Sequence, residues 1–202
     1  MKKYLFTIIS ALVCCSASAQ SPQALLEKFV DRMTKDKGIT MTADAAVATA
    51  SSNGRETVGF SISGKRFRLD SNEFKIWFDG STEWQGTPSD DGISEIYISQ
   101  PPLDNLPDFL KKHDGFSVSG NGTSSFTLTA DDPNGFSGIC SATVTLSPAT
   151  LNPLTVKVVT SSQVGWTVNV TVKEFKSGQE LPDSHFRCNT ADYPEAETID
   201  LR

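Results

Sequence analysis

Hydrophobic and polar positions along the chain follow two different periods. Between Ser21 and Lys37 the apolar residues recur at helical spacing and form one stripe. Ser21 is a good N-cap, Pro22 suits the first helical position, and Gly38 suits the C-terminal cap. The pattern predicts an amphipathic helix over residues 21–37, and its stripe must lie on an apolar surface. The stripe consists of Leu25, Leu26, Phe29, Val30 and Met33.

After Gly38 the apolar residues alternate with polar ones, which is the period of a β-strand. The runs are short and are separated by turn signals such as Asn53-Gly54 and Asp79-Gly80. We expect about ten or eleven mostly antiparallel strands, a pattern typical of a barrel or a strongly curved sheet. A break at residues 100–115 predicts a second, short helix near residues 103–112.

The N-terminal residues have the pattern of a secretory signal. A pair of lysines precedes a short apolar segment, and small residues then lead to Ala19. We expect residues 1–19 to be removed after Ala19, which leaves residues 20–202 as one exported domain. A lipoprotein signal is the alternative, but the residues before Cys14 and Cys15 are not the small ones that such a signal requires.

The charge of the chain argues against two classes of partner. The formal net charge is −6, and removal of Lys2 and Lys3 with the signal makes it −8. An acidic chain without a basic run is a poor ligand for nucleic acid or for an anionic membrane surface. A lipid held in a cavity is still compatible with this charge.

Removal of the signal leaves two cysteines, Cys140 and Cys188. In an oxidising compartment an even pair of cysteines usually forms a disulfide, so we predict a Cys140–Cys188 bridge. The bridge would close a loop of roughly 48 residues and stabilise the fold by about 4 kcal/mol. A redox or nucleophilic pair is disfavoured, because the two cysteines do not form a C-x-x-C motif.

Residues with catalytic potential are few. The two histidines are His113 and His185, and the second follows Asp183 and Ser184 directly. Three adjacent residues cannot present the geometry of a catalytic triad. The sequence has no histidine or cysteine cluster with metal spacing, no P-loop and no dinucleotide fingerprint. We therefore expect no enzyme, no cofactor and no metal.

Several motifs occur in a characteristic order. The N-terminal helix leads to a strand meander with Phe67-Arg68-Leu69, and then to an Asp-Gly-x-x-x-Trp hairpin within residues 74–84. The chain closes with Leu181-Pro182-Asp183-Ser184-His185-Phe186, then Tyr193-Pro194 and a tail ending in Asp-Leu-Arg. Over most of residues 20–202 this order resembles the LolA family of periplasmic lipoprotein carriers.

The resemblance implies a mainly β fold with helical inserts, an unclosed antiparallel half-barrel of about eleven strands under a helical lid. It implies a monomer whose apolar cavity takes the acyl chains of lipoproteins, or of a related lipid. The implied partners are an inner-membrane ATP-driven (ABC) transporter as donor and an outer-membrane acceptor. Cargo would then pass by affinity and not by catalysis. The alternative is a packed β-barrel that serves as an interaction or structural domain of the cell envelope.

The chain departs from the family at one functional position. Better-known carriers have an Arg-Pro shortly before the phenylalanine that matches Phe67, and that arginine holds the lid shut. Here residues 63–66 read Ser-Gly-Lys-Arg, so Arg66 is shifted and no proline is present. The role of a lid arginine is therefore not carried over to Arg66.

The strands carry more large apolar residues than a small closed barrel needs for its core. We predict that ten of them line the lipid cavity or its lid, with a plain core as the alternative. Within one strand, Ile76 and Phe78 should face the cavity while Trp77 lies on the other side. The ten residues are Phe60, Ile62, Phe67, Leu69, Ile76, Phe78, Trp84, Ile96, Ile98 and Phe109.

Overall fold

The computed structural model describes residues 21–35, 37–90, 92–100, 115–133 and 138–202. The predicted signal peptide, the predicted second helix near residues 103–112 and Phe109 lie outside these ranges. In the described ranges one α-helix, α2 (Pro22–Lys35), precedes the strands. The strands are β1 (Ile39–Thr49), β2 (Asn53–Ser63), β3 (Arg66–Asp70), β4 (Lys75–Phe78), β5 (Glu83–Ser89), β6 (Gly92–Ser99), β7 (Phe116–Gly120), β8 (Ser125–Ala130), β9 (Ile139–Leu146), β10 (Pro153–Thr160), β11 (Trp166–Ser177) and β12 (Glu197–Asp200).

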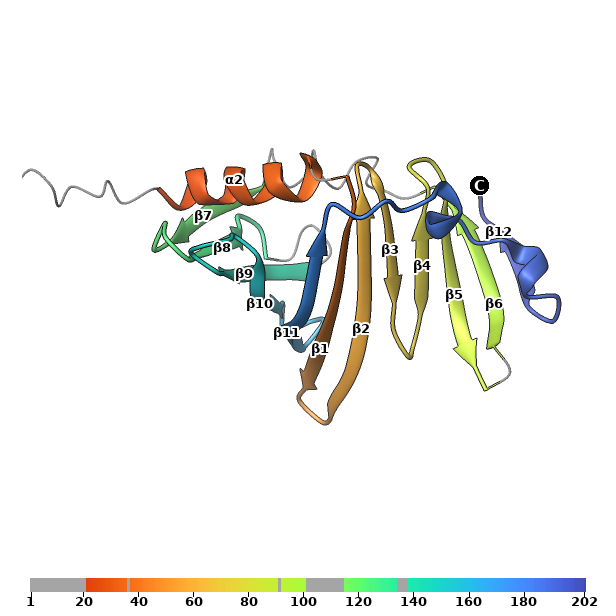
Figure 1. Cartoon of the computed structure of the whole chain (residues 1–202). Helices are drawn as coiled ribbons and strands as arrows, with labels where there is room; N and C mark the ends of the chain where they lie inside the picture. The colour runs from red at the N-terminus through yellow and green to blue at the C-terminus, as the bar shows by residue number, and fades with distance from the viewer. Residues whose placement is uncertain (1–20, 36, 91, 101–114, 134–137) are drawn as a thin grey trace, which may run out of the picture.

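All of these strands belong to one open sheet. Its order is β12-β6-β5-β4-β3-β2-β1-β11-β10-β9-β8-β7, so β12 and β7 form its two edges. Neighbouring strands are antiparallel except β12, which pairs with β6 in parallel. Figure 1 shows that the sheet is strongly bent, because β7–β9 lie at a steep angle to β1–β6. The predicted unclosed half-barrel is confirmed, with twelve strands because the C-terminal tail supplies β12.

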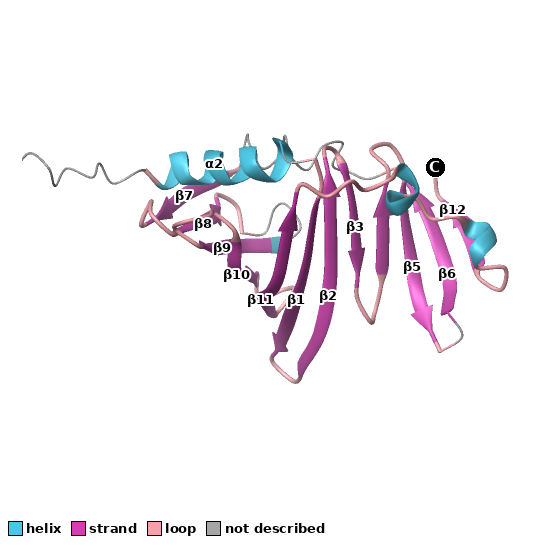
Figure 2. Ribbon diagram, viewed as in Figure 1, coloured by secondary structure: helices cyan, strands magenta, loops and turns pink. Residues whose placement is uncertain are grey.

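Helix α2 lies along the β7–β9 end of the sheet (Figure 2). The Ser21 hydroxyl accepts a hydrogen bond from the Ala24 amide at 3.1 Å, which confirms the predicted N-cap. The apolar stripe packs into a core with the side chains of β7, β8, β9 and β10. The fully buried members of this core include Leu25, Leu26, Val30, Phe126 and Leu146. No helix within the described ranges is long and apolar enough to cross a membrane.

One predicted turn is confirmed and another is wrong. The β4–β5 turn begins at Asp79, whose carboxylate accepts hydrogen bonds from the amides of Ser81 and Thr82 at 3.0 and 2.9 Å. Asn53-Gly54 does not form a turn, because Asn53 is already the first residue of β2. The β1–β2 turn lies at residues 50–52, where the Thr49 hydroxyl accepts hydrogen bonds from the following amides. Such hydroxyl-to-backbone bonds stabilise turns without an Asn-Gly pair.

The C-terminal segment folds back onto the other half of the sheet (Figure 1). After β11 it forms two short 3-10 helices, η2 (Asp183–Phe186) and η3 (Thr190–Asp192), before β12. Cys188 packs against four buried residues of β4, β5 and β6, which are Trp77, Trp84, Ile93 and Ile96. The sheet therefore has a second core under its own tail, separate from the core under α2.

Candidate functional site

Strand pairing divides the sheet into two faces, because residues directly opposite each other in neighbouring strands share a face. We call the face under α2 the helix face and the face under the C-terminal segment the tail face. The core of α2 continues across the helix face through paired Phe126, Val144, Val156, Val170 and Ala45. Alternation along β1 then places Met41 on this same face.

Two rows of apolar side chains cross the helix face beyond α2. The middle row joins five adjacent strands, and its members are Phe175, Met41, Phe60, Leu69 and Ile76. The inner row joins β1 to β4, and its members are Ile39, Ile62, Phe67 and Phe78. The two rows are not equally covered. Ile39, Ile62 and Phe78 are 0–4% exposed, whereas every member of the middle row is only half-buried.

The structure brings six of the ten predicted site residues together on the helix face. They are Phe60, Ile62, Phe67, Leu69, Ile76 and Phe78. Met41 and Phe175 complete the middle row and were missed, because their membership follows from strand register and not from the strands taken singly. Phe109 lies outside the described residues, and so does the predicted lid helix that carries it.

Three predicted lining residues lie on the tail face, which corrects their interpretation. Trp84 is opposite Trp77 and Ile98, and Ile96 packs with them beneath the tail. Ile96 is 0% exposed and Trp84 is 8% exposed, so both belong to a core. The prediction that Trp77 lies on the other face of the sheet from Ile76 and Phe78 is confirmed. The element that covers Trp77 is the tail, where the Tyr193 ring lies 6.3 Å away.

Two arginines hold the tail on its face. Arg66 forms an ion pair with Asp183 and places its guanidinium 4.9 Å from the Phe186 ring. Arg187 pairs with Asp79 at 3.0 Å and lies 5.9 Å from the Trp84 ring. Arg68 lies on the same face, but its partners are in the sheet: it pairs with Asp70 at 2.7 Å and lies 5.6 Å from the Trp77 ring. Among the described residues, the partners of Arg66 are Asp183 and Phe186 of the tail and Ser63 of β2.

The electrostatics of Asp79 lead to a prediction about acid stability. Burial alone would raise the pKa of Asp79, but hydrogen bonds from Thr82, Ser81 and Arg187 hold this pKa below its ordinary value. A carboxyl group with a lowered pKa in the folded state stabilises the fold above its unfolded pKa of about 3.9. That stabilisation is lost as the pH falls through the folded pKa.

We therefore expect Asp79→Asn to be less stable than the wild type at pH 7 and to lose less stability on acidification. Urea unfolding at pH 7, 5 and 3 measures this difference. The control is Asp90→Asn, which removes the same charge from an exposed position between β5 and β6. If the free energies of unfolding of the wild type and of Asp79→Asn fell equally between pH 7 and pH 3, the Asp79 carboxylate would not contribute to the pH dependence of stability.

The predicted disulfide is absent, which is a second correction. Cys140 and Cys188 are both free. Cys140 lies in β9, whereas Cys188 packs on β4–β6 at the other side of the sheet order. The pKa of the Cys188 thiol is raised to about 11, mainly by burial, so this group stays protonated at neutral pH.

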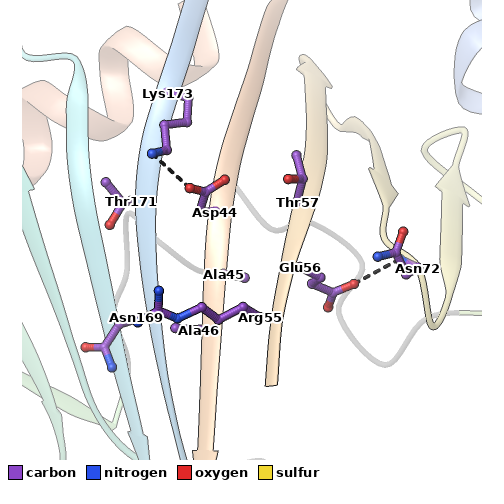
Figure 3. A pocket seen from close by; sticks show the side chains of 10 residues that line it. All are labelled: Asp44, Ala45, Ala46, Arg55, Glu56, Thr57, Asn72, Asn169, Thr171 and Lys173. Carbon is purple, nitrogen blue, oxygen red and sulfur yellow. Dashed lines mark hydrogen bonds and ion pairs between the residues drawn. The ribbon is translucent and has the colours of Figure 1, made fainter. Parts of the chain in front are cut away.

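A polar groove of about 670 Å³ lies between β11, β1 and β2 (Figure 3). Most of its charged groups have partners, since Lys173 pairs with Asp44 at 2.8 Å and the Glu56 carboxylate accepts a hydrogen bond from the backbone N–H of Asn72 at 2.9 Å. In Figure 3 the Arg55 side chain extends across the small Ala46 toward β11. The groove is lined by Asp44, Ala45, Ala46, Arg55, Glu56, Thr57, Asn72, Asn169, Thr171 and Lys173. Such a lining is unsuited to an acyl chain.

Potential metal ligands do not gather into a site in the described part of the chain. No group of three or more potential metal-ligating side chains is present there. His185 lies next to the tail-face core, and burial and then the charge of Arg68 lower its pKa, while Asp70 opposes this. The imidazole is therefore neutral at physiological pH, and its Nε2 atom is buried without a hydrogen-bond partner.

Comparisons with known proteins find solved structures of similar fold. No protein-family model and no curated protein matches the chain. An uncharacterized conserved protein from Thermus thermophilus matches with a TM-score of 0.52 and 12% identity, over 86% of this chain and 97% of that one. A LolA superfamily protein from Nitrosomonas europaea matches with a TM-score of 0.43 and 12% identity, over 87% and 100% of the two chains.

The Pseudomonas aeruginosa MucA/MucB complex also contains a chain of similar fold. The TM-score is 0.48 at 12% identity, and the match covers 84% of this chain and 61% of that one. Identities this low show a shared fold and nothing about function. The chain therefore has the open half-barrel fold that is also seen in the Thermus protein.

Proposed function

We propose that the protein is a periplasmic carrier that binds acyl chains of lipoproteins, or of a related lipid, on its helix face. The observation that carries the proposal is the middle row. Five apolar side chains on five adjacent strands stay half-buried, while three of the four members of the inner row beside them, Ile39, Ile62 and Phe78, are nearly inaccessible. A row of this kind offers apolar surface to a ligand without disturbing the core.

Acyl chains supply the driving force that such a surface needs. Each CH₂ group transferred from water to an apolar surface contributes about 0.8 kcal/mol. The middle row covers only one side of a bound acyl chain, so tight binding needs a second apolar surface on the other side of the acyl chain. We propose that the segment containing Phe109 supplies that surface, as the resemblance to LolA carriers implies.

The proposed place and partners follow from the same resemblance. The predicted signal at residues 1–19 would export the chain, and a carrier between two membranes must hide its cargo from water in the periplasm. We propose an inner-membrane ABC transporter as donor and an outer-membrane acceptor as recipient. Transfer would then require only a difference of affinity between successive sites, without covalent chemistry.

Native mass spectrometry of the protein purified from the periplasm without detergent tests the proposal. We expect a fraction of the molecules to carry one acyl-bearing ligand that organic extraction removes. A protein that is ligand-free under these conditions, and that also fails to bind added palmitate, would favour the structural or interaction domain instead.

A further inference from the structure

Arg32 occupies an unusual position on the helix face. It lies in the last turn of α2, with its guanidinium 5.9 Å from the centre of the Phe175 ring. One terminal nitrogen donates a hydrogen bond to the side-chain oxygen of Asn152 at 2.9 Å. The Nε atom is buried and has no hydrogen-bond partner. A cation thus stands at the border between the core of α2 and the middle row.

The charge of Arg32 is not neutralised by the part of the chain that the structure describes. Its contacts there are an amide oxygen and an aromatic ring, and no described carboxylate pairs with it. A half-buried guanidinium with an unsatisfied N–H is costly unless an anion accompanies it. The carboxyl end of α2 offsets part of this cost, since a cation suits a helix C-terminus. The buried Nε–H still lacks an acceptor.

The middle row begins at this cation. Phe175, which lies under Arg32, is its first member, and Ile76 on β4 is its last. The row spans four inter-strand spacings, roughly 19 Å, which is about the length of an extended chain of some sixteen carbons. Past Ile76 the next residue in register is Gln85, which is polar and exposed. The apolar path therefore has a cationic end and a finite length.

We propose that the helix face takes a single acyl chain that ends in an anionic oxygen group, with the headgroup at Arg32 and the chain along the middle row. This inference rests on the proposed function and narrows it to the related lipid, because the ester- and amide-linked acyl chains of a lipoprotein have no anionic end. Carboxylate and phosphate headgroups share the required chemistry, because a guanidinium binds both through paired N–H donors. Arg32 is then a specificity-determining residue, separate from the tail arginines.

Equilibrium dialysis of the mature protein against palmitate, hexadecyl phosphate and hexadecanol tests the inference. We expect the wild type to bind one or both anionic ligands roughly 10–100-fold more tightly than hexadecanol, as charged hydrogen bonds predict. Arg32→Gln should abolish this preference and leave hexadecanol binding unchanged. Lys35→Gln is the matched control, since it removes a charge from the exposed side of the same helix turn.

The outcomes separate the two proposals. Equal binding of the three ligands by the wild type would overturn the role of Arg32 and leave the carrier function standing. Failure to bind any of them would overturn the carrier function itself. The wild-type comparison decides the inference even if Arg32→Gln is unstable, because it needs no variant. Circular dichroism of both variants establishes whether they are folded.

Discussion

Replacement of Trp77 by alanine is expected to lower the free energy of unfolding by about 3–5 kcal/mol, the usual cost of removing a buried aromatic side chain. Trp77 is 3% exposed and contacts Tyr193 of the tail as well as Trp84 on β5 and Arg68 on β3. The loss is large compared with the roughly 5–15 kcal/mol that stabilise a typical domain. Urea unfolding followed by far-UV circular dichroism measures it.

The control for this variant is Leu154→Ala. Leu154 is 45% exposed, so its truncation should change stability by less than about 1 kcal/mol. A loss below about 1 kcal/mol for Trp77→Ala would contradict the tail-face core. The tail would then be a loosely attached segment, and Trp84 would again become a candidate for ligand contact.

Replacement of Leu69 by aspartate is expected to weaken palmitate binding by at least about 100-fold, because a carboxylate there would have to be desolvated beneath the acyl chain. Leu69 is the fourth member of the middle row, flanked by Phe60 and Ile76. Desolvation of a charge without a partner costs several kcal/mol. Because Leu69 is half-buried in the free protein, the variant should still fold.

Thr155→Asp is the matched control for the Leu69 variant. It introduces the same charge at an exposed position of β10, on the face opposite the α2 core. Equilibrium dialysis should give unchanged palmitate affinity for Thr155→Asp. Equal affinity of Leu69→Asp and the wild type would remove the middle row from the binding site.

The alternation within a single strand predicted much of the candidate site. Ile76 and Phe78 lie on one face and Trp77 on the other, as a period of two requires. The phase between successive strands could not be predicted in this way. Trp84 shares a face with Trp77 because the intervening turn sets their register, and that register is not encoded in either strand alone.

Long-range pairings were also beyond prediction from local patterns. Arg66 meets Asp183 and Phe186 only because the tail returns across the sheet. The two cysteines lie apart because the strand order places β9 far from β4–β6, although their predicted export made a disulfide a reasonable hypothesis. The helix at residues 22–35 needed no such information, because its cap and its stripe are local.

The most direct test of the helix face as the lipid site is photolabelling with a palmitate analogue that carries a diazirine in its acyl chain. Peptide mass spectrometry of the labelled, mature protein then locates the contact residues. Saturable labelling of the middle row, at Met41, Phe60, Leu69 or Ile76, and its suppression by unlabelled palmitate are the predicted result. Labelling confined to the tail face, or labelling that excess palmitate does not suppress, would contradict the helix face as the lipid site.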